Sequence, residues 1–202
     1  MLGSLALSAQ ASVSLTSTST TYAQNFDTLA NSGIQALLTN DSTLPGWSLI
    51  KSDGKPGAGY IVSDGTGQFG SFASCRSYGN GTSTDRSLGM IPAANSNWGS
   101  PAPAVGSVAG WIALDATNNT GGALGAFTLS CAGEQWSSGG SNVPKTLTVE
   151  YGFGSWTAVT NWTAAGAGFN FNTPVQSTSP LSVDGNTTGY MSGLGGTISG
   201  GQ

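Results

Sequence analysis

The stretch "ALGAFTLSCAGEQW", residues 123–136, decides the fold. Phe127, Leu129 and Cys131 alternate with small or polar residues, and a period of two is typical of a half-buried β-strand. Gly133, Glu134, Gln135 and Trp136 follow this alternation directly. The stretch therefore predicts a core strand with a carboxylate and an indole at its end.

Similar runs lie on both sides of this strand, with turn residues between them. The clearest cover residues 12–24, Trp47–Ile50, Leu88–Ile91, Val108–Leu114 and "KTLTVEYGF" at 145–153. In the last run we expect Leu147, Val149 and Tyr151 to face inward and Glu150 to face outward. No stretch has the pattern of a helix of useful length. The sequence therefore predicts an all-β chain, folded as one jelly-roll-like β-sandwich domain.

The composition excludes several classes of function. Only 7% of the 202 residues are charged, against about 25% in ordinary globular chains. The net charge is −4 with five basic residues, so no basic patch for nucleic acid is expected. The chain has no histidine, which excludes Ser-His-Asp and Cys-His catalysis and His-ligated zinc.

The N-terminus predicts secretion. Residues 1–11 combine a short apolar run with the sequence Ala9-Gln10-Ala11, which is typical of a signal-peptide cleavage site. We interpret 1–11 as the remnant of a signal peptide and 12–202 as the sandwich domain, located outside the cell or at its surface. No later stretch has the ~20 apolar residues of a membrane span.

Cys75 and Cys131 are the only cysteines. Two cysteines in a chain with a secretion signal predict one disulfide. The alternative is a pair of buried free thiols.

Several motifs, in this order, resemble one family. They are "YAQNFDTLA" at 22–30, "LPGWSL" at 44–49, "STDRSLG" at 83–89, residues 118–140, "LTVEYGFGSWTAV" at 147–159 and "VDGNTTG" at 183–189. Together they are similar to secreted bacterial β-sandwich modules found in exported proteins with PEP-CTERM sorting tails. The resemblance covers residues 22–199 and implies a β-sandwich without assigned catalytic residues. Similar modules continue with a further strand, so we expect 12–202 to lack its last strand or strands.

Glu134 has two interpretations. It is one of two glutamates in the chain, and beside Trp136 it could be a general acid that works with Glu150, as in glycosidases. It could instead form a buried ion pair with Arg86, because arginine suits a bidentate bond to a carboxylate. No catalytic motif supports the first interpretation, so the structural pair is favoured.

Three further features concern binding. Trp98, in a proline-rich loop, and Trp136 are candidates for an aromatic platform that stacks on sugar rings; packing in the core is the alternative. Asp27 is the best of several acidic positions for a structural calcium ion, although Asp residues are also ordinary turn formers. No other cofactor is predicted.

The predicted function is a non-catalytic extracellular module for surface adhesion, matrix or filament-like assembly. A carbohydrate-binding module and a His-free hydrolase remain alternatives, with polysaccharide or other copies of the chain as partners. Residues 12–24 form a polar, β-prone segment. We expect it either to pair with an open sheet edge of another copy or to be the first strand of its own sheet.

Overall fold

The computed structural model describes residues 12–66, 74–91, 98, 110–154 and 159–199. The predicted signal-peptide remnant, residues 1–11, lies outside this part of the chain. The described residues contain strands and one 3-10 turn but no α-helix. The all-β prediction is confirmed.

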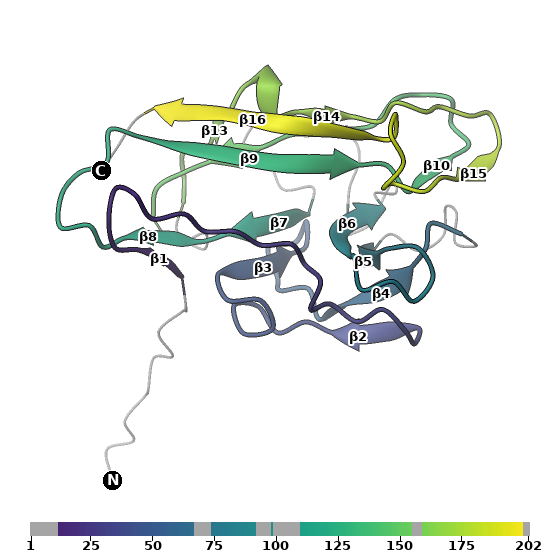
Figure 1. The fold of residues 1–202 in the computed structure, drawn as a ribbon, viewed down its shortest axis with the longest axis horizontal. Helices are drawn as coiled ribbons and strands as arrows, with labels where there is room; N and C mark the ends of the chain where they lie inside the picture. Colours follow the sequence, from purple (N-terminus) through teal and green to yellow (C-terminus); the bar gives the residue numbers. More distant parts are fainter. Residues whose placement is uncertain (1–11, 67–73, 92–97, 99–109, 155–158, 200–202) are drawn as a thin grey trace, which may run out of the picture.

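The longest strands are β9 (Ala126–Glu134) and β16 (Met191–Ser199), which form an antiparallel ribbon along one side of the molecule (Figure 1). Short pairs lie near it in the second half of the chain. They are β10 (Ser137–Gly139) with β15 (Pro180–Ser182), β11 (Thr146–Leu147) with β14 (Phe171–Asn172), and β12 (Glu150–Tyr151) with β13 (Thr163–Ala164). The 3-10 turn η1 spans Ala167–Phe169.

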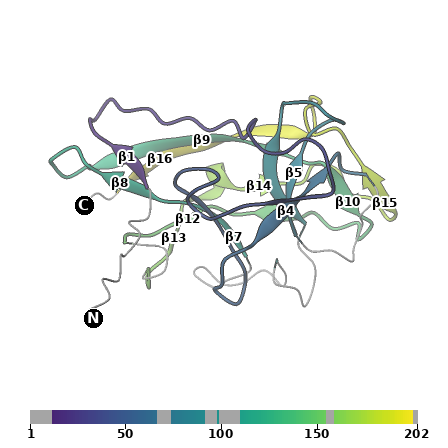
Figure 2. The same ribbon diagram turned by 90° about the horizontal axis from the view of Figure 1, so that it is seen from below.

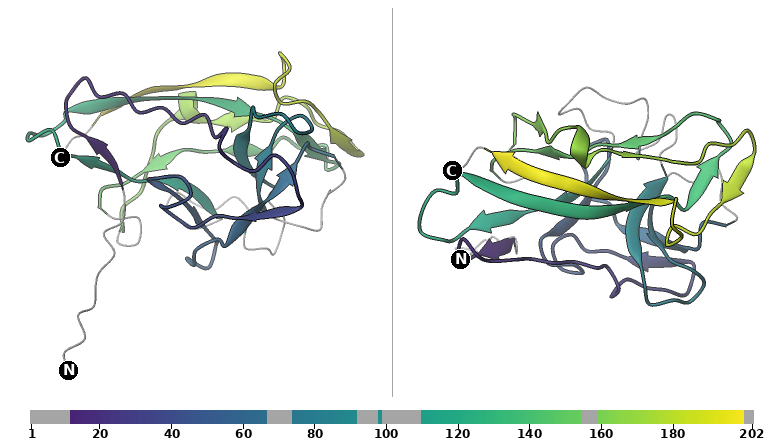
Figure 3. Two further views of the ribbon diagram at one scale, coloured as in Figure 1. Left: turned by 60° about the horizontal axis from the view of Figure 1, so that its bottom comes forward. Right: turned by 45° about the horizontal axis from the view of Figure 1, so that its top comes forward.

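The strands before residue 119 form a second tier, below the ribbon in Figure 1 and forward of it in the left view of Figure 3. One sheet has the order β2 (Gln35–Leu37), β4 (Gly59–Ser63), β5 (Ser74–Tyr78) and β6 (Ser87–Ile91). Two pairs complete the tier: β3 (Trp47–Ile50) with β7 (Trp111–Leu114), and β1 (Val13–Leu15) with β8 (Ala116–Asn118). Figure 2 shows the same elements from below the view of Figure 1. Two tiers of small sheets are consistent with a β-sandwich.

The main core lies in the second tier. Its buried side chains are Leu29, Leu38, Leu44, Leu49, Tyr60, Cys75 and Trp98. The ribbon has its own packing, because Phe169 and Phe171 lie against Gly196 and Gly133 on the face of β9–β16 that also carries buried Ile198. The two glycines have no side chain there, so the rings can approach the backbone closely.

Asn40 shows how an amide side chain replaces strand pairing near this core. Its Nδ2 donates to the Leu49 carbonyl at 3.0 Å, and its Oδ1 accepts the Leu49 N–H at 2.9 Å. Gln135 makes the same pair of bonds to the backbone of Val175, at 2.7 and 2.8 Å. Buried backbone groups outside a ladder need such partners.

Several strands lie where they were predicted. Trp47–Ile50 is found with the predicted bounds, and β6, β7 and β9 overlap their predicted runs. In contrast, the strand predicted over 12–24 is limited to Val13–Leu15. The hydroxyls that gave this segment its β-prone composition instead form a turn, in which Thr20 N–H bonds to the Ser17 carbonyl and the side chains bond to one another.

The run "KTLTVEYGF" is broken into β11 and β12, which pair with different strands. Leu147, predicted to face inward, is 47% exposed. Leu147 lies in β11, which pairs with β14 over two residues only. Such a short strand pair cannot cover an apolar side chain.

Candidate functional site

Glu134 does not form the predicted ion pair with Arg86. Its Oε2 accepts the indole N–H of Trp136 at 3.0 Å, and the same N–H lies 3.1 Å from Ser87 Oγ. Among the described residues, ion pairs within 4 Å join Asp53 to Lys51 and Lys55. Glu134 is therefore tied to the indole beside it, within its own stretch of sequence.

Arg86 is buried, at 2% exposure, but carbonyl oxygens surround it where an acid was expected. Its Nη2 donates to the carbonyls of Ser77 and Ser63, at 2.5 and 3.2 Å, and its Nε donates to Ser77 Oγ at 2.9 Å. Burial lowers the pKa of this guanidinium, which nevertheless stays charged because arginine does not lose its proton in proteins. The prediction that Arg86 is buried is correct, and the predicted partner is wrong because backbone oxygens fill the acceptor positions.

Asp27, the predicted calcium ligand, supports the same arginine. Its Oδ1 accepts the backbone N–H of Arg86 at 3.2 Å, and its Oδ2 accepts a bond of 2.6 Å from the side chain of Asn25. Both carboxylate oxygens thus have donors in the chain. The part of the chain described here holds no group of three His, Cys, Asp or Glu side chains placed to bind a metal ion.

Trp136 and Trp98 are not an exposed platform. Trp136 is 4% exposed and stacks on Tyr78, with ring centroids 5.8 Å apart and planes 7° from parallel. This stack joins the two tiers, because Tyr78 belongs to β5. Trp98 is 8% exposed and lies in the main core, near Gly57. The core alternative holds for both residues, since their ring area is buried by neighbouring strands.

The predicted Cys75–Cys131 disulfide is not formed, and both residues are free thiols. Cys75 is fully buried in β5, opposite Met90, and burial raises the pKa of its thiol strongly. Cys131 is exposed in β9, opposite Leu194. The two strands belong to different tiers, so the even cysteine count misled the prediction.

The two glutamates of the hydrolase alternative have separate neighbours. Glu134 ends β9, which pairs with β16, and Glu150 lies in β12, opposite Ala164 of β13. Neither residue lines the groove described next. The two glutamates thus belong to different strand pairs.

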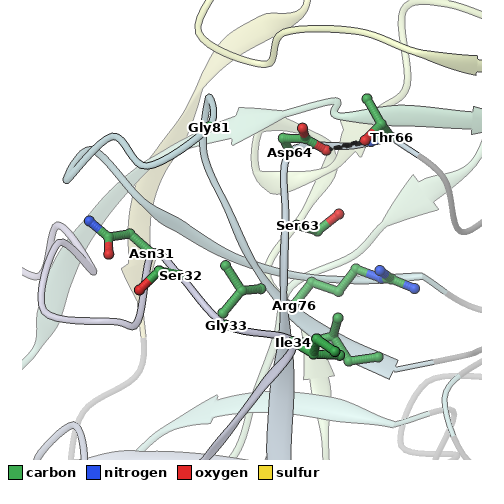
Figure 4. A pocket seen from close by; sticks show the side chains of 11 residues that line it. Asn31, Ser32, Gly33, Ile34, Ser63, Asp64, Thr66, Arg76 and Gly81 are labelled. Atoms are coloured by element: carbon green, nitrogen blue, oxygen red, sulfur yellow. Dashed lines mark hydrogen bonds between the residues drawn. The ribbon is translucent and has the colours of Figure 1, made fainter.

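A groove of about 410 Å³ opens between the segment Asn31–Ile34 and strand β4 (Figure 4). Asn31 and Ser32 lie on one side of the groove, and the Arg76 guanidinium points away from them, toward the right in the view. At its upper end in the view, Asp64 accepts bonds from the Thr66 hydroxyl and the Thr66 N–H, at 2.5 and 2.9 Å. These bonds, the hydroxyl first, hold the pKa of Asp64 below its usual value.

The chemistry of the groove is that of hydrogen bonding. An ionised Asp64 is a poor general acid or base at neutral pH, since catalysis needs a pKa near the working pH. Besides Asp64 and Arg76, the described lining offers amide, hydroxyl and apolar groups, and it carries no nucleophile beside a base. Ile34, 81% exposed, forms part of its rim.

No protein-family model matches the chain, and neither the curated proteins nor the solved structures contain a significant match.

The open backbone edge of β9 was not predicted from the sequence. The N–H of Gln135 donates to the Tyr190 carbonyl at 2.8 Å, one step beyond the register that pairs Glu134 with Met191. Hydrogen-bonded pairs alternate along an antiparallel ladder, so every second residue of β9 directs its N–H and C=O away from β16. These residues are Ala126, Thr128, Ser130, Ala132 and Glu134. In the described chain none of their backbone groups on this side has a hydrogen-bond partner.

Among the described residues, no helix is long and apolar enough to cross a membrane.

Proposed function

We propose that this chain is a non-catalytic extracellular module, a jelly-roll-like β-sandwich that works in surface adhesion, matrix or filament-like assembly. The open edge of the nine-residue strand β9 is the observation that carries the proposal. An unpaired edge is a template for another strand. Natural edges are protected by charge, proline or short length, and β9 is long, lacks proline and carries its one charge at Glu134, the last residue.

The contacts of the other candidate residues also support a structural role. Both arginines are at most 2% exposed, and Arg86, Glu134, Asp27 and Trp136 all take part in internal hydrogen bonds. The residues singled out as candidate site residues thus make contacts within the fold. The low charge of the chain favours close contact between copies, because little like-charge repulsion opposes it.

The two alternatives have less support. Carbohydrate binding needs an exposed aromatic platform, and Trp98 and Trp136 are buried. Hydrolysis needs two carboxyl groups ~5–9.5 Å apart across a cleft, and Glu134 is bonded to an indole within its own tier. A structural calcium at Asp27 would have to displace two N–H donors.

Sedimentation equilibrium on residues 12–202 tests the proposal. We expect the average mass to rise with protein concentration between ~1 and ~200 μM, the range of weak interfaces. A glycan array run in parallel covers the carbohydrate alternative. A mass that stays at one chain throughout, combined with selective glycan binding, would overturn assembly in favour of carbohydrate recognition.

A further inference from the structure

The edge of β9 is self-complementary. If β9 of one copy meets β9 of a second copy antiparallel, with Ser130 opposite Ser130, then Thr128 lies opposite Ala132 and Ala126 opposite Glu134. All of these residues direct their backbone groups outward. Each outward N–H therefore meets an outward C=O, which is the arrangement of a hydrogen-bonded antiparallel pair.

The side chains also fit this register. At the positions whose backbone N–H and C=O groups point outward, the side chains share one face of the sheet. There small Ser, Thr and Ala side chains oppose one another, and Glu134 opposes Ala126, so no like charges face each other across the pair. On the other face Phe127, which is 40% exposed, lies opposite Gly133 of the second copy. Gly133 is already covered by Phe171 of its own chain, so Phe127 of the second copy would lie beside that ring and extend the aromatic face.

The other edge of the ribbon is less accessible. Gly195 of β16 directs its carbonyl outward, and a Cβ added to Gly168 of η1 would lie 3.1 Å from that oxygen. The turn η1 thus stands beside the β16 edge. On the β9 edge, no backbone hydrogen bond of the described chain reaches the outward carbonyls.

We propose that two copies of this chain associate through β9, across a two-fold axis at Ser130, to form a continuous β16–β9–β9–β16 sheet. This inference rests on the proposed function and names its partner and its surface. A two-fold interface uses the same patch on both subunits and is therefore closed. It predicts a dimer as the basic unit of the assembly.

A second occupant of the edge is the segment after β1. Thr16–Ala23 are exposed, and in Figure 1 this segment runs below β9. Its side chains and backbone bond mainly to one another through Ser17, Ser19 and Thr20. Pairing of β9 with β9 requires no rearrangement of either strand, whereas this segment would first have to lose its turn.

Proline substitutions on residues 12–202 test the interface. The Ser130 N–H points away from β16, so Ser130→Pro removes a donor of the proposed interface and keeps the β9–β16 ladder. We expect the dimer to weaken at least about tenfold, since two hydrogen bonds and the close central contact are lost. Thr197→Pro is the matched control, because Thr197 points outward on β16, opposite Thr128, and should leave the dimer unchanged.

Two further measurements keep the test decisive if a proline variant folds poorly. Ser130→Lys places two like charges opposite each other across the axis, so dimerisation should weaken and should recover partly in ~0.5 M salt. A short bismaleimide should link Cys131 of one copy to Cys131 of the other, because the register makes them diagonal neighbours, about 7–8 Å apart. Cys75 is buried and should not react.

The outcomes separate the two proposals. A parent dimer that is weakened by both Ser130 substitutions and linked at Cys131 supports the β9 interface. An assembly that forms equally well in the Ser130 variants overturns this interface but keeps the proposed function, and it points to the Thr16–Ala23 segment or to β16. A parent chain that remains monomeric at ~200 μM overturns both.

Discussion

At the scale of single residues, the chain places both of its arginines inside the molecule. Arg86 is one of only two arginines, yet its guanidinium donates to the carbonyls of Ser63 and Ser77 rather than to an acid. Hydrogen bonds to a charged group are worth about 1.5–3 kcal/mol each. This single side chain therefore holds β4, β5 and the start of β6 together.

Replacing Arg86 with methionine should be strongly destabilising. The buried Ser77 carbonyl and hydroxyl lose the guanidinium as a donor, and the Ser63 carbonyl keeps only the Gly79 N–H. We therefore expect the free energy of unfolding to fall by at least about 3 kcal/mol. Urea unfolding followed by tryptophan fluorescence measures it. Lys55→Met is the control, since Lys55 is exposed and 4.0 Å from Asp53, and should change stability by less than about 0.5 kcal/mol. Equal losses in the two variants would contradict the role of Arg86.

Glu134→Gln should be nearly neutral. The amide oxygen of glutamine can accept the Trp136 N–H as the carboxylate does, so we expect less than about 1 kcal/mol of destabilisation. Glu134→Ala removes the acceptor and should cost about 1–2 kcal/mol, limited because Ser87 Oγ also lies within reach of the indole. Thermal unfolding distinguishes them. A glutamine variant as unstable as the alanine variant would show that the charge matters, contrary to the observed bond.

At the scale of elements, Gly65 shows how a turn is fixed between the two tiers. It follows β4 at φ 84°, and a Cβ there would collide with the backbone carbonyl of Trp136. Gly54 has a similar φ of 75° but open space around its Cβ position. Both glycines adopt the left-handed backbone conformation, but only Gly65 is packed against another segment.

Gly65→Ala should therefore be more destabilising than Gly54→Ala. The left-handed conformation alone costs alanine about 1 kcal/mol, which is the expected loss at Gly54. At Gly65 the collision adds to it, and we expect a total of at least about 2–3 kcal/mol. Chemical denaturation of both variants gives the difference directly. Equal losses would mean that the contact between β4 and the Trp136 segment is not tight.

Strand positions could be predicted where an apolar run is bounded by turn residues. Trp47–Ile50 follows a Pro-Gly turn, and Ser48, Leu49 and Ile50 are all buried. The segment 12–24 failed because serine and threonine side chains bond to nearby backbone as readily as they fit a strand. Local pattern also says nothing about which strand lies beside which, so the open edge of β9 could not be foreseen.

The candidate site was predictable only in part, for the same reason. Arg86 was expected to be buried as the partner of Glu134, but its partners are carbonyl oxygens, which every residue carries and no motif marks. The cysteine pair failed because an even count gives no distance between strands. Residue type indicated which side chains are structurally important, and only the topology shows their partners.

At the scale of the whole molecule, two carboxyl groups should shape the dependence of stability on pH in opposite ways. Burial, and secondarily the charge of Asp41, raises the pKa of Asp115 above its usual value. The hydrogen bonds from Thr66 lower the pKa of Asp64. A raised pKa in the folded state contributes stability at low pH that is lost as the pH rises through that pKa. A lowered pKa contributes stability at high pH that is lost as the pH falls through it.

Asparagine substitutions should reveal these opposite signs. At pH 7 the ionised Asp115 disfavours the fold, so Asp115→Asn should raise Tm by about 1–3 °C. At pH 3 the carboxyl is largely protonated, and the gain should disappear. Asp64→Asn should instead lower Tm at pH 7, because the ionised carboxylate is the better acceptor for the two Thr66 donors, and this loss should shrink as the pH falls below 3.8, the usual value for Asp. Calorimetry from pH 3 to pH 8 on both variants and the parent measures the two curves. Shifts of the same sign at pH 7 would contradict the assignment of these two environments, because burial and hydrogen bonding act on the charged form in opposite directions.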